Sequence, residues 1–353
     1  MIDITSNRLR FRAQLRPALG TRFQPTGFPD LGAAEYTGYR DGEPVRTLLV
    51  ESPQSMANRL ENTAWDIAAQ APVGLVRDLP YIEVRKAEEP HPFVTTSRQE
   101  AHRLASPYVR SSLLGGRAMT QVIAERFGLA NDQPLDYPAI ARAVFALDPF
   151  TLLHGCFFNQ KEWPGQPKFA RAASAAIEAY DVEQAVSGGR KSDHVRHHTG
   201  KDADPEEGTA LAGSSEGYGS IPFQRVEYTA RLIEAQFSVD VQLLRTYALG
   251  SEQTELLAAL ALWEIRTFLD GGLRLRTACD LELTEVVASS VPLPETETLE
   301  ARIRELISAV TPDLDHTGPL TVLWDGGKTT KRAKSSKKPP AQKTRELTEA
   351  AAQ

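Results

Sequence analysis

The sequence predicts an α+β fold in which helices cover one face of a sheet and leave the other face open. Several segments alternate apolar and polar residues with a period of two, as half-buried strands do. Several others repeat apolar residues along one side at helical spacing. Strands and helices are mixed along the chain, which is typical of this class.

The first strand is predicted over 8–16, where Leu9, Phe11, Ala13 and Leu15 share one face and the arginines share the other. Pro17 and Gly20 stop it. A second apolar strand covers 48–50. Ser52 is a good N-cap and Pro53 suits the first helical position, so we expect a helix from there to about residue 69.

Shorter elements are predicted in the middle of the chain. A weak strand is expected over 79–86, and a Ser97–Glu100 capping box opens a short helix that Pro107 ends. Helices follow over 119–127, with Gly128 as cap, and from Pro138. The apolar run 148–158 is expected to be a buried strand.

The last third alternates again. Strands are predicted over 231–241, 273–283 and 320–324, and helices over 252–269 and 296–310. One body is expected over 1–324, with a mobile glycine-rich insertion at 187–222. The segment 325–353 is basic and poor in apolar residues, so we expect a disordered tail.

Composition narrows the function classes. The chain has 353 residues, 41% of them hydrophobic, and a net charge of −6, so nucleic-acid binding would have to rest on local patches. Cys156 and Cys279 are interpreted as reduced core thiols. No secretion signal is visible, and the run LLAALALW is too short to span a bilayer, so a cytoplasmic protein is expected.

Two segments combine strand alternation with arginine. Arg8, Arg10 and Arg12 alternate in the first, and Arg274 and Arg276 in the segment 273–283. Arginine grips phosphate with two donors and stacks on bases, so neighbouring strands of this kind would suit single-stranded nucleic acid. The alternative is a solvated face in which Arg274 and Arg276 pair with acidic neighbours.

The stretch SPQSMANR is a second candidate. A helix start preceded by Ser52, Gln54 and Ser55 offers N–H groups and hydroxyls to an anion, with Asn58 and Arg59 one turn further on. The alternative is a plain capped helix that binds nothing.

A histidine-rich segment invites a metal hypothesis, with Asp193, His194, His197 and His198 close together. Its glycine-flanked, polar surroundings favour instead a basic loop that contacts a polyanion through residues such as Lys191. His102 and His154 are isolated, and no signature of a catalytic triad, phosphate loop or metalloprotease occurs. We therefore predict no metal and no cofactor.

Six stretches carry a family resemblance. They are RFQPTGFPDLGAAEY, LVESPQSMANRLE, TSRQEAHRLASPY, LLHGCFF, GYGSIPFQRVEYTA and FLDGGLRLRTACDLE. In this order they resemble the backbone subunit of the type I-G (formerly I-U) CRISPR effector, a RAMP-superfamily protein of the seventh Cas family. The resemblance extends from residue 8 to about 290.

The resemblance implies a palm like an RNA-recognition motif (ferredoxin-like), with inserted finger and thumb segments. It implies a Cascade subunit without catalytic activity, copies of which polymerise along a CRISPR RNA so that target DNA pairs with the guide. Implied partners are the large subunit and the subunit that binds and processes the repeat handle. The residues expected to bind RNA are Arg8, Arg10, Arg12, Arg22, Gln24, Ser52, Gln54, Ser55, Asn58, Arg59, His102, Arg103, Lys191, Arg274 and Arg276.

The loop RFQPTGFPDLG is interpreted as a rigid connector that leaves the first strand. Phe23 and Phe28 would anchor it, and Arg22 and Gln24 would face the guide; a purely structural loop is the alternative. Two other functions stay open: an RNA-cleaving RAMP subunit that uses Asp30 or Asp193, and an RNA chaperone that acts through its basic tail.

Overall fold

The computed structural model describes residues 4–28, 32–192, 220–288 and 291–326. The chain divides into two compact units. The first, here called the sheet unit, consists of Met1–Ala64, Ala172–Gln242 and Ala258–Ile303. The second unit consists of Trp65–Arg171, Leu243–Leu257 and Arg304–Gln353.

The sheet unit is built on a seven-stranded sheet in which every neighbouring pair is antiparallel. Its order is β16 (Leu273–Arg276), β17 (Cys279–Ala288), β1 (Leu9–Pro17), β15 (Ser220–Val239), β14 (Ala173–Ser192), β5 (Glu43–Glu51) and β4 (Glu35–Arg40). A small ribbon, β2 (Gly27–Phe28) with β3 (Gly32–Ala33), completes the strands of this unit.

Four central strands have the ferredoxin-like arrangement. Their order across the sheet is β17-β1-β15-β14, all antiparallel. Helix α1 (Pro53–Asn62) lies between β1 and β14 in the chain, and α7 (Ser251–Asp270) lies between β15 and β17. This is a β-α-β-β-α-β order with strands 4-1-3-2 side by side. The predicted α+β class and the RNA-recognition-motif-like palm are confirmed.

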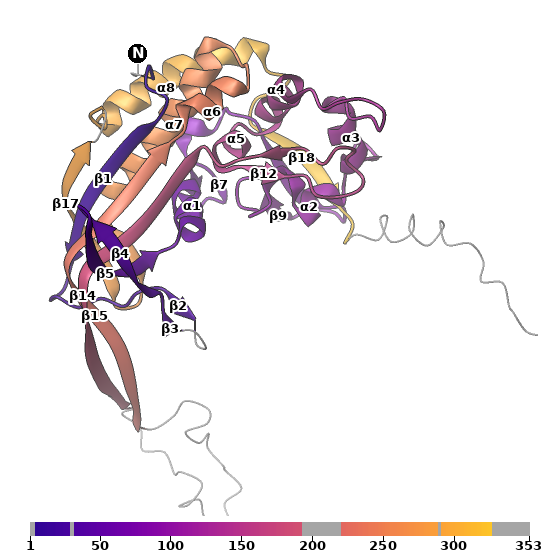
Figure 1. Cartoon of the computed structure of the whole chain (residues 1–353). Helices are drawn as coiled ribbons and strands as arrows, with labels where there is room; N and C mark the ends of the chain where they lie inside the picture. Colours follow the sequence, from indigo (N-terminus) through magenta and orange to yellow (C-terminus); the bar gives the residue numbers. More distant parts are fainter. Residues whose placement is uncertain (1–3, 29–31, 193–219, 289–290, 327–353) are drawn as a thin grey trace, which may run out of the picture. The chain divides into compact units, whose positions relative to one another are not determined.

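The core of this unit lies on one face of the sheet, as the alternation predicts. Leu9, Phe11 and Leu15 are at most 5% exposed. On the neighbouring β15, the ring of Phe237 packs against Phe268 of α7 at 6.3 Å between centroids. Helix α1 buries Met56 and Leu60, and the helices lie to one side of the strands (Figure 1). The other face is therefore left to polar side chains.

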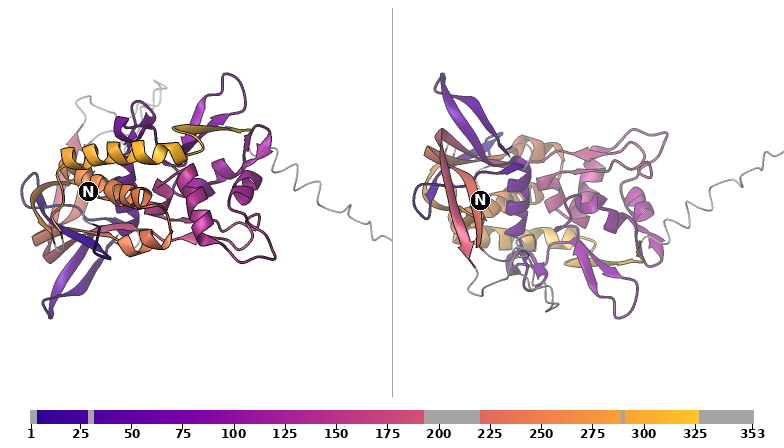
Figure 2. Two further views of the ribbon diagram at one scale, coloured as in Figure 1. Left: turned by 90° about the horizontal axis from the view of Figure 1, so that it is seen from above. Right: turned by 90° about the horizontal axis from the view of Figure 1, so that it is seen from below.

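Strands β14 and β15 form a long hairpin that continues past its neighbours as a two-stranded ribbon (Figures 1 and 2). Pairing runs from Ala173 with Val239 to Ser192 with Ser220. The ends of the predicted insertion, 187–192 and 220–222, are thus strand residues. The rest of it, including the histidine-rich segment, lies outside the described residues, as does most of the predicted tail.

Helix α6 (Val241–Thr246) leads towards α7, and α8 (Thr296–Val310) follows β17. Both long helices were predicted within one residue of their bounds. The segment 273–283 is not one strand: it turns back at Thr277 and Ala278, where Ala278 has φ of 57°, so β16 and β17 pair with each other. The alternation continues through the turn, which is why period alone did not reveal it.

The second unit has a five-stranded sheet of order β11 (Arg117–Ala118), β10 (Ser112–Leu114), β18 (Pro319–Trp324), β8 (Tyr81–Lys86) and β9 (Phe93–Thr96). Its helices are α2 (Pro107–Arg110), α3 (Met119–Arg126), α4 (Tyr137–Leu147) and α5 (Phe150–His154). Two ribbons, β6 (Trp65–Asp66) with β7 (Ala71–Pro72) and β12 (Cys156–Phe157) with β13 (Lys168–Phe169), complete it.

Three details of the predicted helices are wrong, one in the sheet unit and two in the second unit. Helix α1 ends at Asn62, not near 69. Pro107 begins helix α2, with Ser106 as N-cap, instead of ending a helix. The proposed capping pair is engaged elsewhere, because Ser97 donates to Asp148 at 2.6 Å and Glu100 accepts from Thr95.

The predicted strand 148–158 is instead helix α5 followed by the short β12. Asp148 accepts a hydrogen bond from the Phe150 N–H at 3.1 Å, and Gly155, with φ of 78°, ends the helix. Every residue of α5 is buried, including the polar Thr151 and His154, so no side of the run faces solvent and its pattern does not distinguish helix from strand. Within the described residues, no helix combines the length and apolarity that crossing a membrane requires.

Candidate nucleic-acid interface

The open face of the sheet unit carries the arginines of β1 and Arg8, which directly precedes this strand. Arg8, Arg10, Arg12 and Arg16 are exposed, while the residues between them are buried or half-buried. The alternation predicted from the sequence therefore places these guanidinium groups on the side of the sheet away from its core. Arg274 is likewise exposed on β16, opposite Asp280 of β17.

Two of these arginines form exposed ion pairs. The Arg8 guanidinium lies 2.5 Å from the Asp240 carboxylate, and the Arg16 guanidinium lies 3.0 Å from Glu282. Their arginine side chains are 52% and 68% exposed. Exposed pairs of this kind contribute about 0–1 kcal/mol, so a phosphate group can replace the carboxylate partner at little cost.

Arg12 belongs to a more buried arrangement. The Arg12 and Arg40 guanidinium groups lie 4.0 and 3.5 Å from the same oxygen of Glu234. The Glu234 side chain is 5% exposed. Arg40 also lies over the ring of Tyr180, 4.9 Å from its centroid.

Tyrosines surround a second carboxylate on this face. Tyr36 and Tyr180 donate hydrogen bonds to the two oxygens of Glu178, at 2.6 and 2.7 Å. Burial, and then the hydrogen bond to Glu178, raises the pKa of both phenols above the usual value. Both therefore stay protonated donors at neutral pH.

A shallow hollow of about 550 Å³ lies on the open face beside these groups. Its wall includes Arg10 and Arg12 of β1 and Pro53, the first residue of α1. The remaining lining residues are Phe11, Ser174, Ala175, Ala176, Gln236, Phe237 and Ser238. Two motifs singled out in the sequence, the arginine-bearing strand and the SPQSMANR helix start, thus meet at one place.

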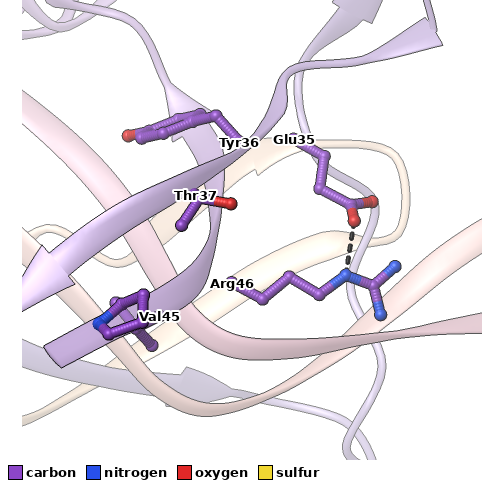
Figure 3. A pocket seen from close by; sticks show the side chains of 6 residues that line it. Glu35, Tyr36, Thr37, Val45 and Arg46 are labelled. Atoms are coloured by element: carbon purple, nitrogen blue, oxygen red, sulfur yellow. Dashed lines mark hydrogen bonds and ion pairs between the residues drawn. The ribbon is translucent and has the colours of Figure 1, made fainter.

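Another hollow, on the β4–β5 pair, is less suited to an anion. Glu35 and Arg46 lie side by side and form an ion pair, while Tyr36 points away (Figure 3). The Arg46 hydrogen bond holds the pKa of Glu35 below its ordinary value. Arg46 also lies 3.1 Å from Glu183, so carboxylates occupy this guanidinium on two sides.

Several residues predicted to bind RNA hold the sheet unit together instead of facing solvent. The Glu51 carboxylate is 2% exposed and accepts hydrogen bonds from Ser55, Arg59 and Arg276. Arg59 also donates to the Leu275 carbonyl at 2.6 Å. We call Glu51 with its three partners the Glu51 cluster.

The Glu51 cluster also fixes the loop RFQPTGFPDLG. Arg276 donates to the carbonyls of Gln24 and Val50, at 3.1 and 2.9 Å. The Gln24 N–H donates to Ala278 at 2.8 Å. The loop is therefore tied by its backbone to both β5 and the β16–β17 turn.

Phe23 anchors this loop, as predicted. Its side chain is fully buried, and its backbone forms an isolated β-bridge with Tyr228 of β15. Arg22 next to it is 54% exposed and lies 3.4 Å from Glu227. Pro29 and Asp30 lie outside the described residues.

The remaining predicted residues are scattered. On α1, Ser52 accepts a hydrogen bond from the Ser55 N–H, and Gln54 and Asn58 are exposed. In the second unit His102 is exposed, whereas Arg103 is 7% exposed and donates to the Gly155 carbonyl at 2.8 Å. Lys191 lies on β14, and its side chain is outside what the structure describes.

Sequence reasoning missed the residues that β15, β14 and β4 contribute to the open face. Gln236 and Ser238 occupy the polar positions of the predicted strand 231–241, so that alternation was an available signal. Arg40 and Glu234 are distant in sequence and meet only through the strand order.

Residues 9–184 match a family model described as "CRISPR-associated protein GSU0053 (Cas_GSU0053)". No curated protein matches the chain by sequence.

Two solved structures are similar in outline. One, "CRISPR RNA-guided surveillance complex, pre-nicking", is 13% identical with a TM-score of 0.37, and the match covers 83% of this chain and 80% of that one. The other, "Crystal structure of Thermofilum pendens Csc2", is 11% identical with a TM-score of 0.29, covering 86% and 77%. At these scores neither structure carries an argument, and the fold rests on the strand order. Residues 9–184 of this chain therefore carry the sequence pattern of the CRISPR-associated GSU0053 family.

Proposed function

We propose that this protein is a CRISPR RNA-binding backbone subunit of a type I effector complex (Cascade), and that it holds the guide for pairing with target DNA. The observation that carries the proposal is the hollow on the open face, where Arg10 and Arg12 meet the start of α1. The match of residues 9–184 to a CRISPR-associated family supports the biological setting.

The chemistry of the hollow suits a sugar–phosphate backbone. Arg10 and Arg12 supply guanidinium groups, and Ser174, Gln236 and Ser238 supply neutral donors and acceptors. Guanidinium groups bind phosphate, while hydroxyls and amides suit phosphate oxygens or the 2′-hydroxyl of RNA. A guide of variable sequence requires contacts of this kind, which carry no base preference.

Most of the predicted RNA-binding residues fall into two groups under this proposal. Arg8, Arg10 and Arg12 contact RNA on the open face, with Gln54 and Asn58 available near the start of α1. The Glu51 cluster and Arg103 support the fold, since their polar groups are engaged within the protein.

We further propose that several copies assemble along one guide, in an effector of the type I-G class, in the cytoplasm. The partners are CRISPR RNA, further copies of this chain, the large subunit, and the subunit that binds and processes the repeat handle. Target DNA joins through the complete complex. The chain itself is proposed to bind RNA without cutting it.

Salt-dependent binding to single-stranded RNA tests the interface. Arg10→Ala and Arg12→Ala should each weaken binding and lower the slope of log affinity against log salt by about 0.7. The matched control is Arg117→Ala, an exposed arginine of the second unit that pairs with Glu125. If the Arg10 and Arg12 variants bind as Arg117→Ala does, the open face is not the interface.

The runner-up function, RNA cleavage by Asp30 or Asp193, concerns residues outside the described part of the chain. Incubating the assembled complex with complementary RNA and Mg²⁺ separates the two functions. Intact target RNA agrees with a binding subunit, whereas regularly spaced cuts that Asp30→Asn or Asp193→Asn abolishes would establish the enzyme.

A further inference from the structure

Glu234 lies in an unexpected place for an acidic residue, on the face proposed to bind RNA. It is 4% exposed and lies on β15 between Gln14 of β1 and Glu178 of β14, its Cα partners in the sheet. A carboxylate at this position would ordinarily repel phosphate. Its contacts indicate another role.

Two guanidinium groups meet at one oxygen of this carboxylate. Arg12 Nη1 lies 4.0 Å from Glu234 Oε2, and Arg40 Nη2 lies 3.5 Å from the same oxygen. The two arginines come from β1 and β4, which lie on opposite sides of β15 in the sheet. Without the carboxylate, two like charges would be left to repel each other at this point.

Other contacts hold the same group of residues. The ring of Tyr180 lies under the Arg40 guanidinium, and Gln236 donates to the Tyr180 hydroxyl at 2.6 Å. Gln236 also donates to Glu234 Oε1, at 3.4 Å. Because Arg12 and Gln236 line the hollow, the carboxylate connects Arg40 to the wall of the proposed RNA site.

The arrangement of charges here differs from that of the neighbouring ion pairs. Arg8 with Asp240, and Arg16 with Glu282, are one-to-one pairs with exposed arginines. Glu234 has two arginine partners, whereas the neighbouring Glu178 carboxylate accepts hydrogen bonds from two tyrosines. With both carboxylates counted, the two arginines are balanced in charge. The Glu234 carboxylate is almost entirely shielded from solvent, whereas the Arg12 side chain is 48% exposed, so an incoming phosphate meets the cation first.

We propose that Glu234 is a positioning residue for RNA: it holds Arg12 and Arg40 together, oriented for the phosphate backbone. The inference rests on the proposed function. It adds a residue whose negative charge alone would predict weaker binding to RNA. An arginine already fixed loses less side-chain entropy on binding, so a preorganised pair binds more tightly than two mobile ones. Removing this acid therefore weakens RNA binding.

The test compares Glu234→Gln with Glu282→Gln by fluorescence anisotropy on one single-stranded RNA, after thermal melts establish that both variants are folded. Both substitutions remove one negative charge from the sheet unit, and glutamine keeps the size of the side chain. We expect Glu234→Gln to weaken RNA binding about fivefold. We expect Glu282→Gln to leave binding unchanged or slightly stronger, because its partner Arg16 is solvated.

A double-mutant cycle with Arg12→Lys separates positioning from loss of folding. Lysine keeps the charge but not the planar fork that Glu234 orients. We expect Arg12→Lys to weaken binding in the wild-type background and to change little when Glu234→Gln is also present. Additive effects, or tighter binding by Glu234→Gln, would overturn the inference.

The outcomes also separate this inference from the proposed function. If the wild-type protein fails to bind RNA, alone and in its effector complex, the proposed function itself is wrong. If the wild type binds and Arg10→Ala weakens it, but Glu234→Gln behaves like Glu282→Gln, then only the positioning role is refuted.

Discussion

Removing the Glu51 carboxylate should destabilise the sheet unit more than removing any exposed acid. Glu51→Ala leaves Arg59 and Arg276 without their counter-charge, although their side chains are only 25% and 23% exposed. Breaking a buried pair by removing one partner costs about 3–5 kcal/mol. Because about a quarter of each arginine meets solvent, we expect a loss near the lower limit, about 3 kcal/mol.

Thermal melting measures this loss. For a unit of this size, 1 kcal/mol corresponds to about 2–4 °C, so Glu51→Ala should melt about 6–12 °C below the wild type. Glu51→Gln keeps an acceptor for Ser55, so its melting temperature should lie between those of Glu51→Ala and the wild type. The control is Glu282→Ala, whose pair with Arg16 is 49% and 68% exposed and should contribute less than about 1 kcal/mol. Equal melting temperatures for Glu51→Ala and Glu282→Ala would refute the structural role of the Glu51 cluster.

Three further predictions concern the second unit and the thiols. Burial raises the pKa of Cys156 to about 12 and that of Cys279 to about 11, so neither thiol should react with a thiol reagent at neutral pH until the protein is denatured; fast labelling of the native protein would contradict this. Burial holds the pKa of His154 well below 6.5, so the unfolded chain takes up a proton that the folded chain does not, and stability should fall as the pH drops below about 6.5. His154→Asn should reduce the pH dependence of stability in thermal melts across this pH range. An unchanged pH dependence would contradict the role given to His154. Gly155 has φ of 78°, and a Cβ there would lie 2.9 Å from the Phe169 carbonyl. Gly155→Ala should therefore lower the free energy of unfolding in urea by more than about 2 kcal/mol. Gly128→Ala should lower it by about 1 kcal/mol, because a Cβ there meets nothing within 4 Å. Similar losses for the two glycines would show that the contact at Gly155 relaxes freely.

Elements with a clear local period could be predicted from the sequence. The alternation of Leu9 to Leu15 and the apolar stripe of α8 each place one face in the core, and the structure agrees. Periodicity did not predict the conformation where burial is complete, as in α5, because no side of a fully buried run faces solvent. It also failed at Thr277 and Ala278, where a turn preserves the alternation while reversing the chain.

The candidate site was predictable only in part, because charge is visible in a sequence but its partner is not. Arg12 and Arg276 look alike as members of arginine-bearing strands, yet one lines an open hollow and the other pairs with the buried Glu51. The second contact joins residues 225 positions apart. Glu234 and Arg40 likewise meet only because β15, β14, β5 and β4 lie in that order. Strand order therefore decides which predicted arginines face solvent on the open face.

The central claim is that the open face binds RNA and that copies of this chain line up along it. Native mass spectrometry over a series of single-stranded RNA lengths, at two salt concentrations, tests it most directly. The wild type should bind in copies that increase stepwise with RNA length, and the double variant Arg10→Ala, Arg12→Ala should lose these steps while remaining folded. Stepwise binding that persists in the double variant would contradict the assignment of the open face. Binding without steps would contradict assembly by this chain alone.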